Sequence, residues 1–104
     1  MTRGEVWWVE FEPPLGRRPA VLISRDRAYR TRAAITVVPL TRTIRGIPVE
    51  VLLEPSDGMP RRSVANADDI ITVAKARAHS YICTLSPAKL ADVERAIKFA
   101  LDLP

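Results

Sequence analysis

Short apolar runs separated by turn-forming residues recur along the chain, at lengths typical of β-strands. Residues 4–11 are rich in β-branched and aromatic side chains, and they stop at Pro13 and Pro14, which cannot continue a strand ladder. Residues 19–24 are almost continuously apolar, as in a strand that is buried on both faces. The same criteria predict further strands, with a bend allowed in the longest, at residues 34–40, 47–53, 62–73 and 80–84.

The C-terminal segment has the period of an amphipathic helix. Ser86 can cap its first turn, and Pro87 suits the first helical position. Residues 25–33 carry four arginines without a clear period, which indicates an exposed turn or a short helix. The apolar positions of the C-terminal helix are Leu90, Val93, Ile97, Ala100 and Leu101.

Five or six short strands followed by one helix exclude a parallel doubly wound sheet, because the crossover helices are missing. The pattern favours a mainly β fold with a C-terminal α-helix, arranged as a compact antiparallel barrel of SH3-like or OB-like type. The chain has 104 residues, of which 47% are hydrophobic, and this size predicts one domain that spans residues 1–104.

The charge balance points to a polyanionic partner. The net charge is +4, and 13 of the 16 basic residues are arginines, which make forked contacts to phosphate and stack on bases. A genome rich in arginine codons is the alternative explanation. Cys83 is the only cysteine, and no histidine and cysteine lie at ligand spacing, so we expect no disulfide, no metal site and no cofactor.

The first residues run directly into a predicted strand, without an apolar stretch long enough for a signal peptide or a membrane span. We therefore expect a cytoplasmic protein that has no membrane partner. A reducing compartment also suits a chain with a single cysteine.

Two polar groups lie at the ends of predicted strands. Arg17 and Arg18 precede the second strand, and Thr41, Arg42 and Thr43 follow the third. If these strands are neighbours, the Arg18 guanidinium and the Thr41 hydroxyl face one cavity. A surface arginine and a strand-end threonine are the alternative interpretation.

Four segments together resemble the MazF/PemK toxin family, and the similarity extends from about residue 3 to the C-terminus. The order of an Arg-Pro-apolar-Val-Leu motif and a later Pro-x-Thr motif is the specific part of this resemblance. The matching segments are Gly-Glu-Val-Trp-Trp-Val-Glu-Phe at 4–11, Arg-Pro-Ala-Val-Leu-Ile-Ser at 18–24, Val-Pro-Leu-Thr at 38–41 and Gly-Ile-Pro-Val-Glu-Val at 46–51.

The resemblance implies a CcdB-like barrel, a symmetric homodimer and a metal-independent endoribonuclease. Such an enzyme cleaves single-stranded RNA at short motifs and leaves a 2′,3′-cyclic phosphate and a 5′-hydroxyl. The family's essential arginine and threonine correspond to Arg18 and Thr41, and Asp68 matches an aspartate that PemK-like members use as a base. Asn66 stands where those members have an arginine, and the first loop, residues 12–18, is shorter than in many members.

Further residues are candidates for RNA binding, and for each a solvated loop charge is the alternative. Asp68 and Asp69 can also pair with arginines. The candidates are Arg17, Arg42, Thr43, Arg45 and Asp69, with Arg61 and Arg62 as additional phosphate contacts.

Three other residues are interpreted from their surroundings in the sequence. Trp7 and Trp8 must point to opposite faces of a strand, which places at least one in the core and leaves the other as core, interface or base platform. His79 lies in a polar run outside the matched motifs and is interpreted as a surface residue.

The hypotheses for function fall into three classes. The first is a toxin ribonuclease that is neutralised by a MazE-like antitoxin, whose acidic disordered tail folds onto the basic groove. The second is a CcdB-like topoisomerase poison, but that branch relies on a Trp-Gly-Ile tail, whereas this chain ends Ala-Leu-Asp-Leu-Pro. The third is a non-catalytic RNA-binding barrel.

Overall fold

The computed structural model describes all 104 residues and contains seven strands, which pair only in the antiparallel sense. The strands are β1 (Glu5–Glu10), β2 (Arg17–Leu22), β3 (Ala34–Thr41), β4 (Glu50–Leu53), β5 (Ser63–Asn66), β6 (Ile71–Ala74) and β7 (Ala78–Thr84). The helices are α1 (Ala28–Thr31) and α2 (Pro87–Ala100), with short 3-10 turns η1 (Pro55–Asp57), η2 (Ala67–Asp69) and η3 (Lys75–Arg77).

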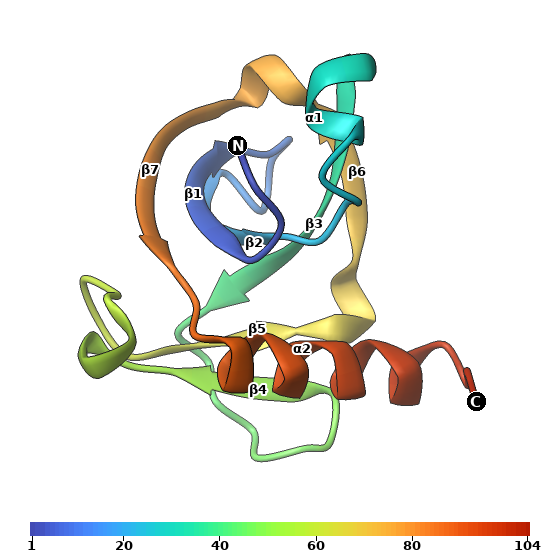
Figure 1. Ribbon diagram of the computed structural model, residues 1–104. Helices are drawn as coiled ribbons and strands as arrows, with labels where there is room; N and C mark the ends of the chain where they lie inside the picture. The colour runs from blue at the N-terminus through green and yellow to red at the C-terminus, as the bar shows by residue number, and fades with distance from the viewer.

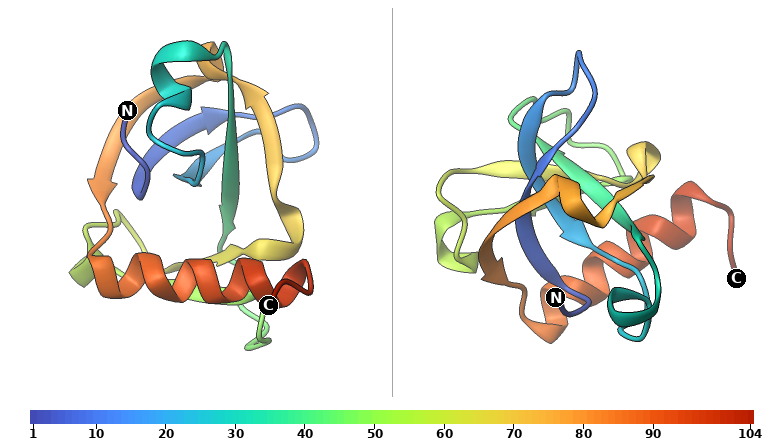
Figure 2. Two further views of the ribbon diagram at one scale, coloured as in Figure 1. Left: turned by 45° about the vertical axis from the view of Figure 1, so that its right-hand side comes forward. Right: turned by 90° about the horizontal axis from the view of Figure 1, so that it is seen from above.

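The sheet runs in the order β4-β5-β3-β2-β1-β7, and β6 pairs with the first half of β3. It curls strongly, so that β1, β2, β3, β6 and β7 surround one core while β4 and β5 extend beneath them along α2 (Figure 1). Figure 2 shows from two further sides that α2 lies across one end of this barrel. The prediction of a mainly β fold with a C-terminal helix is confirmed, and the curvature agrees with an SH3-like, CcdB-like barrel.

Two hydrophobic clusters lie on opposite faces of the sheet. One fills the barrel and includes Val9, Leu22 and Ile35, each at most 1% exposed. The other lies between the sheet and α2, which contributes Val93 and Ala96. Side chains alternate between faces along a strand, so each central strand supplies both clusters. This explains why residues 19–24 are almost continuously apolar.

The predicted strand over residues 62–73 is wrong as a single element. Asn66 is 7% exposed, and its side-chain oxygen accepts a hydrogen bond from the backbone N–H of Asp68 at 2.9 Å. This local bond turns the chain into η2, because an Asn side chain competes with the strand ladder for backbone donors. The segment is therefore divided between β5 and β6, which pair with different halves of β3.

Other predicted boundaries shift by a few residues. The fourth strand begins at Glu50 rather than Ile47, because the Glu50 carboxylate accepts bonds from the backbone N–H groups of Arg45 and Gly46 and holds the preceding residues in a loop. The C-terminal helix begins as predicted, since the Ser86 hydroxyl accepts a bond from Lys89 N at 3.1 Å. It ends at Ala100, so the prediction of Leu101 as one of its apolar positions is wrong, and Leu101 is 55% exposed.

Gly58 lies at a point where the loop before β5 packs closely against β7. Its φ is +100°, and a Cβ added there would lie 2.7 Å from the Cβ of Cys83. We expect Gly58→Ala to lower the free energy of unfolding by about 2–4 kcal/mol. The cost of a left-handed backbone conformation for alanine adds to the cost of the steric overlap with Cys83. Gly46→Ala is the matched control, with φ +71° and no atom within 4 Å, and we expect it to lose about 1 kcal/mol. Urea unfolding measures both, and equal losses would contradict the packing argument.

Candidate active site

An open cavity of about 870 Å³ lies where β2 begins, β3 ends and the chain enters β5. Its polar lining comes from four arginines, two threonines and one serine, and the rest is apolar. The polar residues are Arg17, Arg18, Arg42, Arg61, Thr41, Thr43 and Ser63. The apolar ones are Trp8, Pro19, Leu40, Met59 and Pro60.

Arg18 is held in the cavity by backbone carbonyls. Its Nε and Nη2 donate to the carbonyl oxygen of Leu15 at 2.9 and 2.6 Å, and Nη1 donates to the carbonyl oxygen of Leu40 at 3.4 Å. Gly16, with φ +65°, lets the loop turn back so that Phe11 N bonds to Gly16 O at 3.0 Å. The short first loop therefore fixes the guanidinium against the end of β3.

Thr41 lies at the last position of β3, beside Arg18. The pairing of Ala20 with Pro39 continues by register to Arg18 and Thr41, in agreement with the bond from Arg18 to Leu40. The Thr41 hydroxyl oxygen accepts a bond from Thr43 N at 3.2 Å. A hydroxyl carries one proton in addition to its acceptor positions, so Thr41 keeps a donor for a ligand.

The lining of the cavity carries positive charge and contains no carboxylate. No aspartate or glutamate lines it, and none of its four arginines takes part in an ion pair. The guanidinium carbon of Arg17 instead lies 4.8 Å from the ring centroid of Trp8. All free polar groups on the arginines are donors, so the arrangement suits an anionic ligand.

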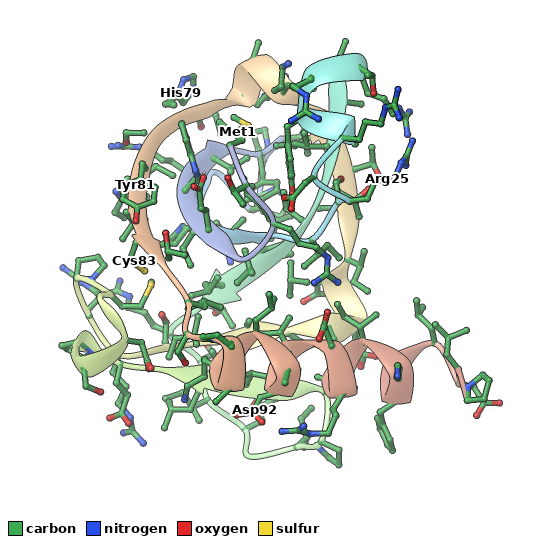
Figure 3. The ribbon with its side chains drawn as sticks, viewed as in Figure 1. Met1, Arg25, His79, Tyr81, Cys83 and Asp92 are labelled. Carbon is green, nitrogen blue, oxygen red and sulfur yellow. The ribbon has the colours of Figure 1, made fainter.

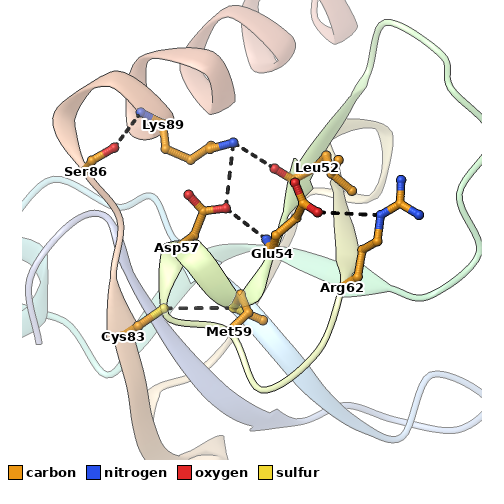
Figure 4. Close-up of polar contacts among 8 residues, drawn as sticks. All are labelled: Leu52, Glu54, Asp57, Met59, Arg62, Cys83, Ser86 and Lys89. Carbon is orange, nitrogen blue, oxygen red and sulfur yellow. Dashed lines mark hydrogen bonds and ion pairs between the residues drawn. The ribbon is translucent and has the colours of Figure 1, made fainter.

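The wall formed by the loop before β5 is anchored to α2 and β7 (Figure 4). Asp57 accepts a bond from Glu54 N at 2.8 Å and lies 3.7 Å from Lys89 Nζ, which also donates to the carbonyl oxygen of Leu52. Met59 packs with its Sδ 3.9 Å from Cys83 Sγ. Burial raises the pKa of the Cys83 thiol, with a smaller contribution from Asp57, so the thiol stays protonated near neutral pH.

Four residues predicted for the site lie outside the cavity, and one of them, Arg62, instead has its Nε 3.9 Å from a carboxylate oxygen of Glu54. Asp68 and Asp69 are exposed on η2, beyond the far end of β5 from the cavity. Arg45 lies in the loop after β3, where its backbone N–H bonds to Glu50. His79 is exposed on the outer side of β7, as interpreted from the sequence (Figure 3). No group of three or more His, Cys, Asp or Glu side chains is placed to hold a metal ion.

Sequence reasoning did not find the apolar side of the cavity. Met59 and Ser63 are 4% and 3% exposed, and nothing in their sequence separates them from core residues. Trp8 was identified only as one of two tryptophans on opposite faces. The partner that distinguishes it is Arg17, which comes from the next strand and stacks on its ring.

A family model described as the PemK-like, MazF-like toxin of type II toxin-antitoxin systems matches residues 2–101. The chain belongs to this PemK/MazF toxin family. A relative from Mycobacterium tuberculosis, the probable endoribonuclease MazF5, is 42% identical over 96% of this chain and 92% of its own length. Endoribonuclease MazF9 of the same organism is 39% identical over 99% of this chain and 98% of its own length.

Solved structures of PemK/MazF toxins share the fold. An endoribonuclease in complex with its cognate antitoxin, from a mycobacterial species, superposes with a TM-score of 0.86 at 32% identity, over 100% of this chain and 97% of that chain. None of the helices of the protein is long and apolar enough to cross a membrane.

The anchored wall predicts a stability effect. Replacing Asp57 with alanine removes both the cap of η1 and the partner of Lys89. We expect Asp57→Ala to lower the free energy of unfolding by about 1–2 kcal/mol. Asp92→Ala is the control, because Asp92 pairs with Arg95 on the exposed face of α2, and we expect a change within about 0.5 kcal/mol. Urea unfolding of the two variants measures the difference, and equal effects would show that Asp57 does not anchor the wall.

Proposed function

We propose that this chain is a toxin endoribonuclease that cleaves single-stranded RNA in the cavity, with Arg18 and Thr41 as its catalytic residues. The observation that carries the proposal is the position of Arg18 and Thr41 side by side in a cavity that holds three further arginines and no carboxylate. Membership of the PemK/MazF toxin family and the names of its endoribonuclease relatives support the substrate class.

The reaction transfers the phosphoryl group within the RNA. The 2′-hydroxyl oxygen forms a bond to the adjacent phosphorus, the bond from phosphorus to O5′ breaks, and one proton passes overall from O2′ to O5′. The products are a 2′,3′-cyclic phosphate and a 5′-hydroxyl. Extra negative charge develops on the non-bridging oxygens as the bond forms, so donors that are already in place lower the barrier.

Arg18 and Thr41 are suited to that charge. A guanidinium has five N–H donors. Three of those on Arg18 bond to backbone carbonyls, which leaves two for the phosphate. The fixed orientation reduces the entropy lost when the transition state forms. A guanidinium stays protonated near neutral pH, so Arg18 stabilises charge and does not act as the base.

The same basic cavity accounts for control by an antitoxin. We propose that the cognate MazE-like antitoxin covers it with an acidic, disordered segment that folds on binding. A related endoribonuclease has been solved in complex with its cognate antitoxin. Arg17, Arg42 and Arg61 then serve both partners, as phosphate contacts for RNA and as pairs for carboxylates. We further propose that the toxin is a homodimer and works in the cytoplasm.

One assay tests the function. Purified protein is incubated with a long single-stranded RNA in the presence of a chelator, and the fragment ends are analysed. We expect fragments with cyclic phosphate ends. Binding without cutting would support a non-catalytic RNA-binding barrel instead, and intact RNA with arrested gyrase would support a topoisomerase poison.

Arg18 and Thr41 should each be essential in this assay. We expect Arg18→Ala and Thr41→Ala to reduce cleavage roughly 100- to 1,000-fold, the cost of removing one charge-stabilising donor. Thr41→Ser keeps the hydroxyl and should retain most activity. Arg30→Ala, on α1 and exposed, removes an arginine outside the cavity and should leave cleavage unchanged. Normal cleavage by the Arg18→Ala or Thr41→Ala protein would refute the assignment.

The predicted base Asp68 receives a separate test. Its carboxylate is exposed on η2 and does not line the cavity, whereas a general base must come within hydrogen-bond reach of the proton that it removes. We therefore expect Asp68→Asn to change the cleavage rate by less than about threefold, well short of a general base's contribution. A loss of two orders of magnitude, with unchanged thermal unfolding, would restore Asp68 as the base.

A further inference from the structure

The cavity has two chemically different halves, which follow from the alternation of side chains along each strand. Arg18 pairs with Val9, and by register Thr41 lies next to Arg18, so these side chains continue the face that encloses the barrel core. Trp8 pairs with Pro19, one position along both strands, and therefore belongs to the opposite face. The strands end here, so one cavity joins both faces.

The Trp8 half is an apolar recess with one polar group in its wall. Leu40 and Met59 line it and are 2% and 4% exposed. Leu40 pairs with Ala65, and Ser63 lies two positions before Ala65, so Ser63 is on the same face of β5. A nucleobase is flat, with apolar faces and a polar edge, and this matches an apolar wall that contains one hydroxyl group.

Ser63 is the one polar side chain in the structure that is buried without a partner. It is 3% exposed, and its Oγ is the sole buried side-chain oxygen or nitrogen that makes no hydrogen bond. Buried hydroxyl groups are almost always paired, because an unpaired one forfeits its hydration. A hydroxyl that lines a ligand cavity and lacks a partner is therefore placed to bind the ligand.

The polar groups around the recess define the kind of base edge that fits. Arg17 lies over the Trp8 ring, and Arg61 lines the same cavity. Guanidinium groups can only donate, and the Ser63 hydroxyl also has a proton to donate. An edge with carbonyl oxygens, as in uracil or guanine, meets these donors better than the amino group of cytosine or adenine.

We propose that the Trp8 half of the cavity is a nucleobase subsite, in which a uracil or guanine next to the scissile linkage stacks on Trp8 and accepts a hydrogen bond from Ser63. The proposal rests on the proposed function, because Arg18 and Thr41 define where the scissile linkage lies. Arg17 moves from the Trp8 ring to the base edge or to a phosphate when the base enters. Trp8 and Ser63 then determine which base the enzyme accepts beside the cut.

Fluorescence can test the stacking. The Trp7→Phe protein retains Trp8 as its only tryptophan, and Trp7 lies on the other face against Tyr81, outside the cavity. The probes are short oligouridylate and oligocytidylate, 2′-O-methylated throughout so that they cannot be cut. We expect oligouridylate to quench Trp8 and to bind roughly 3- to 10-fold more tightly than oligocytidylate, the value of one neutral hydrogen bond.

Variants separate the contribution of stacking on Trp8 from that of the hydrogen bond from Ser63. Trp8→Leu should weaken oligouridylate binding roughly 5- to 150-fold through loss of stacking. Trp8→Phe keeps a ring and should bind nearly as well, while the emission of the remaining Trp7 stays constant. Ser63→Ala should reduce the preference for oligouridylate over oligocytidylate, and its unfolding temperature should stay the same or rise, because the hydroxyl has no partner to lose.

Three results would overturn the subsite. They are unchanged Trp8 emission at saturating oligouridylate, equal affinity for the two oligonucleotides, and a Ser63→Ala protein that melts several degrees lower while keeping its base preference. Cleavage of unmodified RNA is measured in parallel on the wild-type protein. Cleavage without quenching of Trp8 would contradict the subsite and support the ribonuclease function. Quenching with a preference for uracil but without cleavage would support base binding at Trp8 and contradict the ribonuclease function.

Discussion

The site depends on the hydrogen bonds from the Arg18 guanidinium to two backbone carbonyl oxygens. One carbonyl belongs to Leu15 in the first loop and the other to Leu40 near the end of β3. The guanidinium meets both because the first loop brings Leu15 back to Arg18 and β2 pairs with β3 in the observed register. The hairpin and the sheet therefore orient the arginine before any ligand arrives, which is how a fold lowers the cost of binding a charged transition state.

The cavity concentrates like charges, and the rest of the molecule compensates for their repulsion. Its four arginines have no acidic partner within the chain, while the ion pairs lie elsewhere, as between Arg3 and Glu94 or between Lys89 and Asp57. Two hydrophobic clusters and the anchored wall supply stability that offsets this repulsion. An anionic ligand that binds in the cavity relieves the repulsion, so the electrostatic contribution to its binding free energy is favourable.

Much of the fold follows from local patterns, and the exceptions have local causes. The C-terminal helix was predicted from its cap and its period, and most strands from their apolar runs. Residues 62–73 were predicted as one strand because the hydrogen bond from Asp68 N to the Asn66 side chain leaves no periodic signal. Arg18 and Thr41 are candidates from their positions at strand ends, and the family resemblance assigns their catalytic role, whereas Met59, Pro60 and Ser63 resemble ordinary loop or core residues.

The sequence by itself determined the mainly β class, the terminal helix, the basic character and the arginine and threonine that match the toxin family. These properties are encoded by neighbours along the chain, through hydrophobic period, capping and charge. Only the tertiary structure decided which tryptophan joins the cavity, that Ser63 is left without a partner there, and that Asp68 lies apart. The reason is physical: these relations depend on strand register and sheet curvature, which place side chains from β1, β2, β3 and β5 around one space.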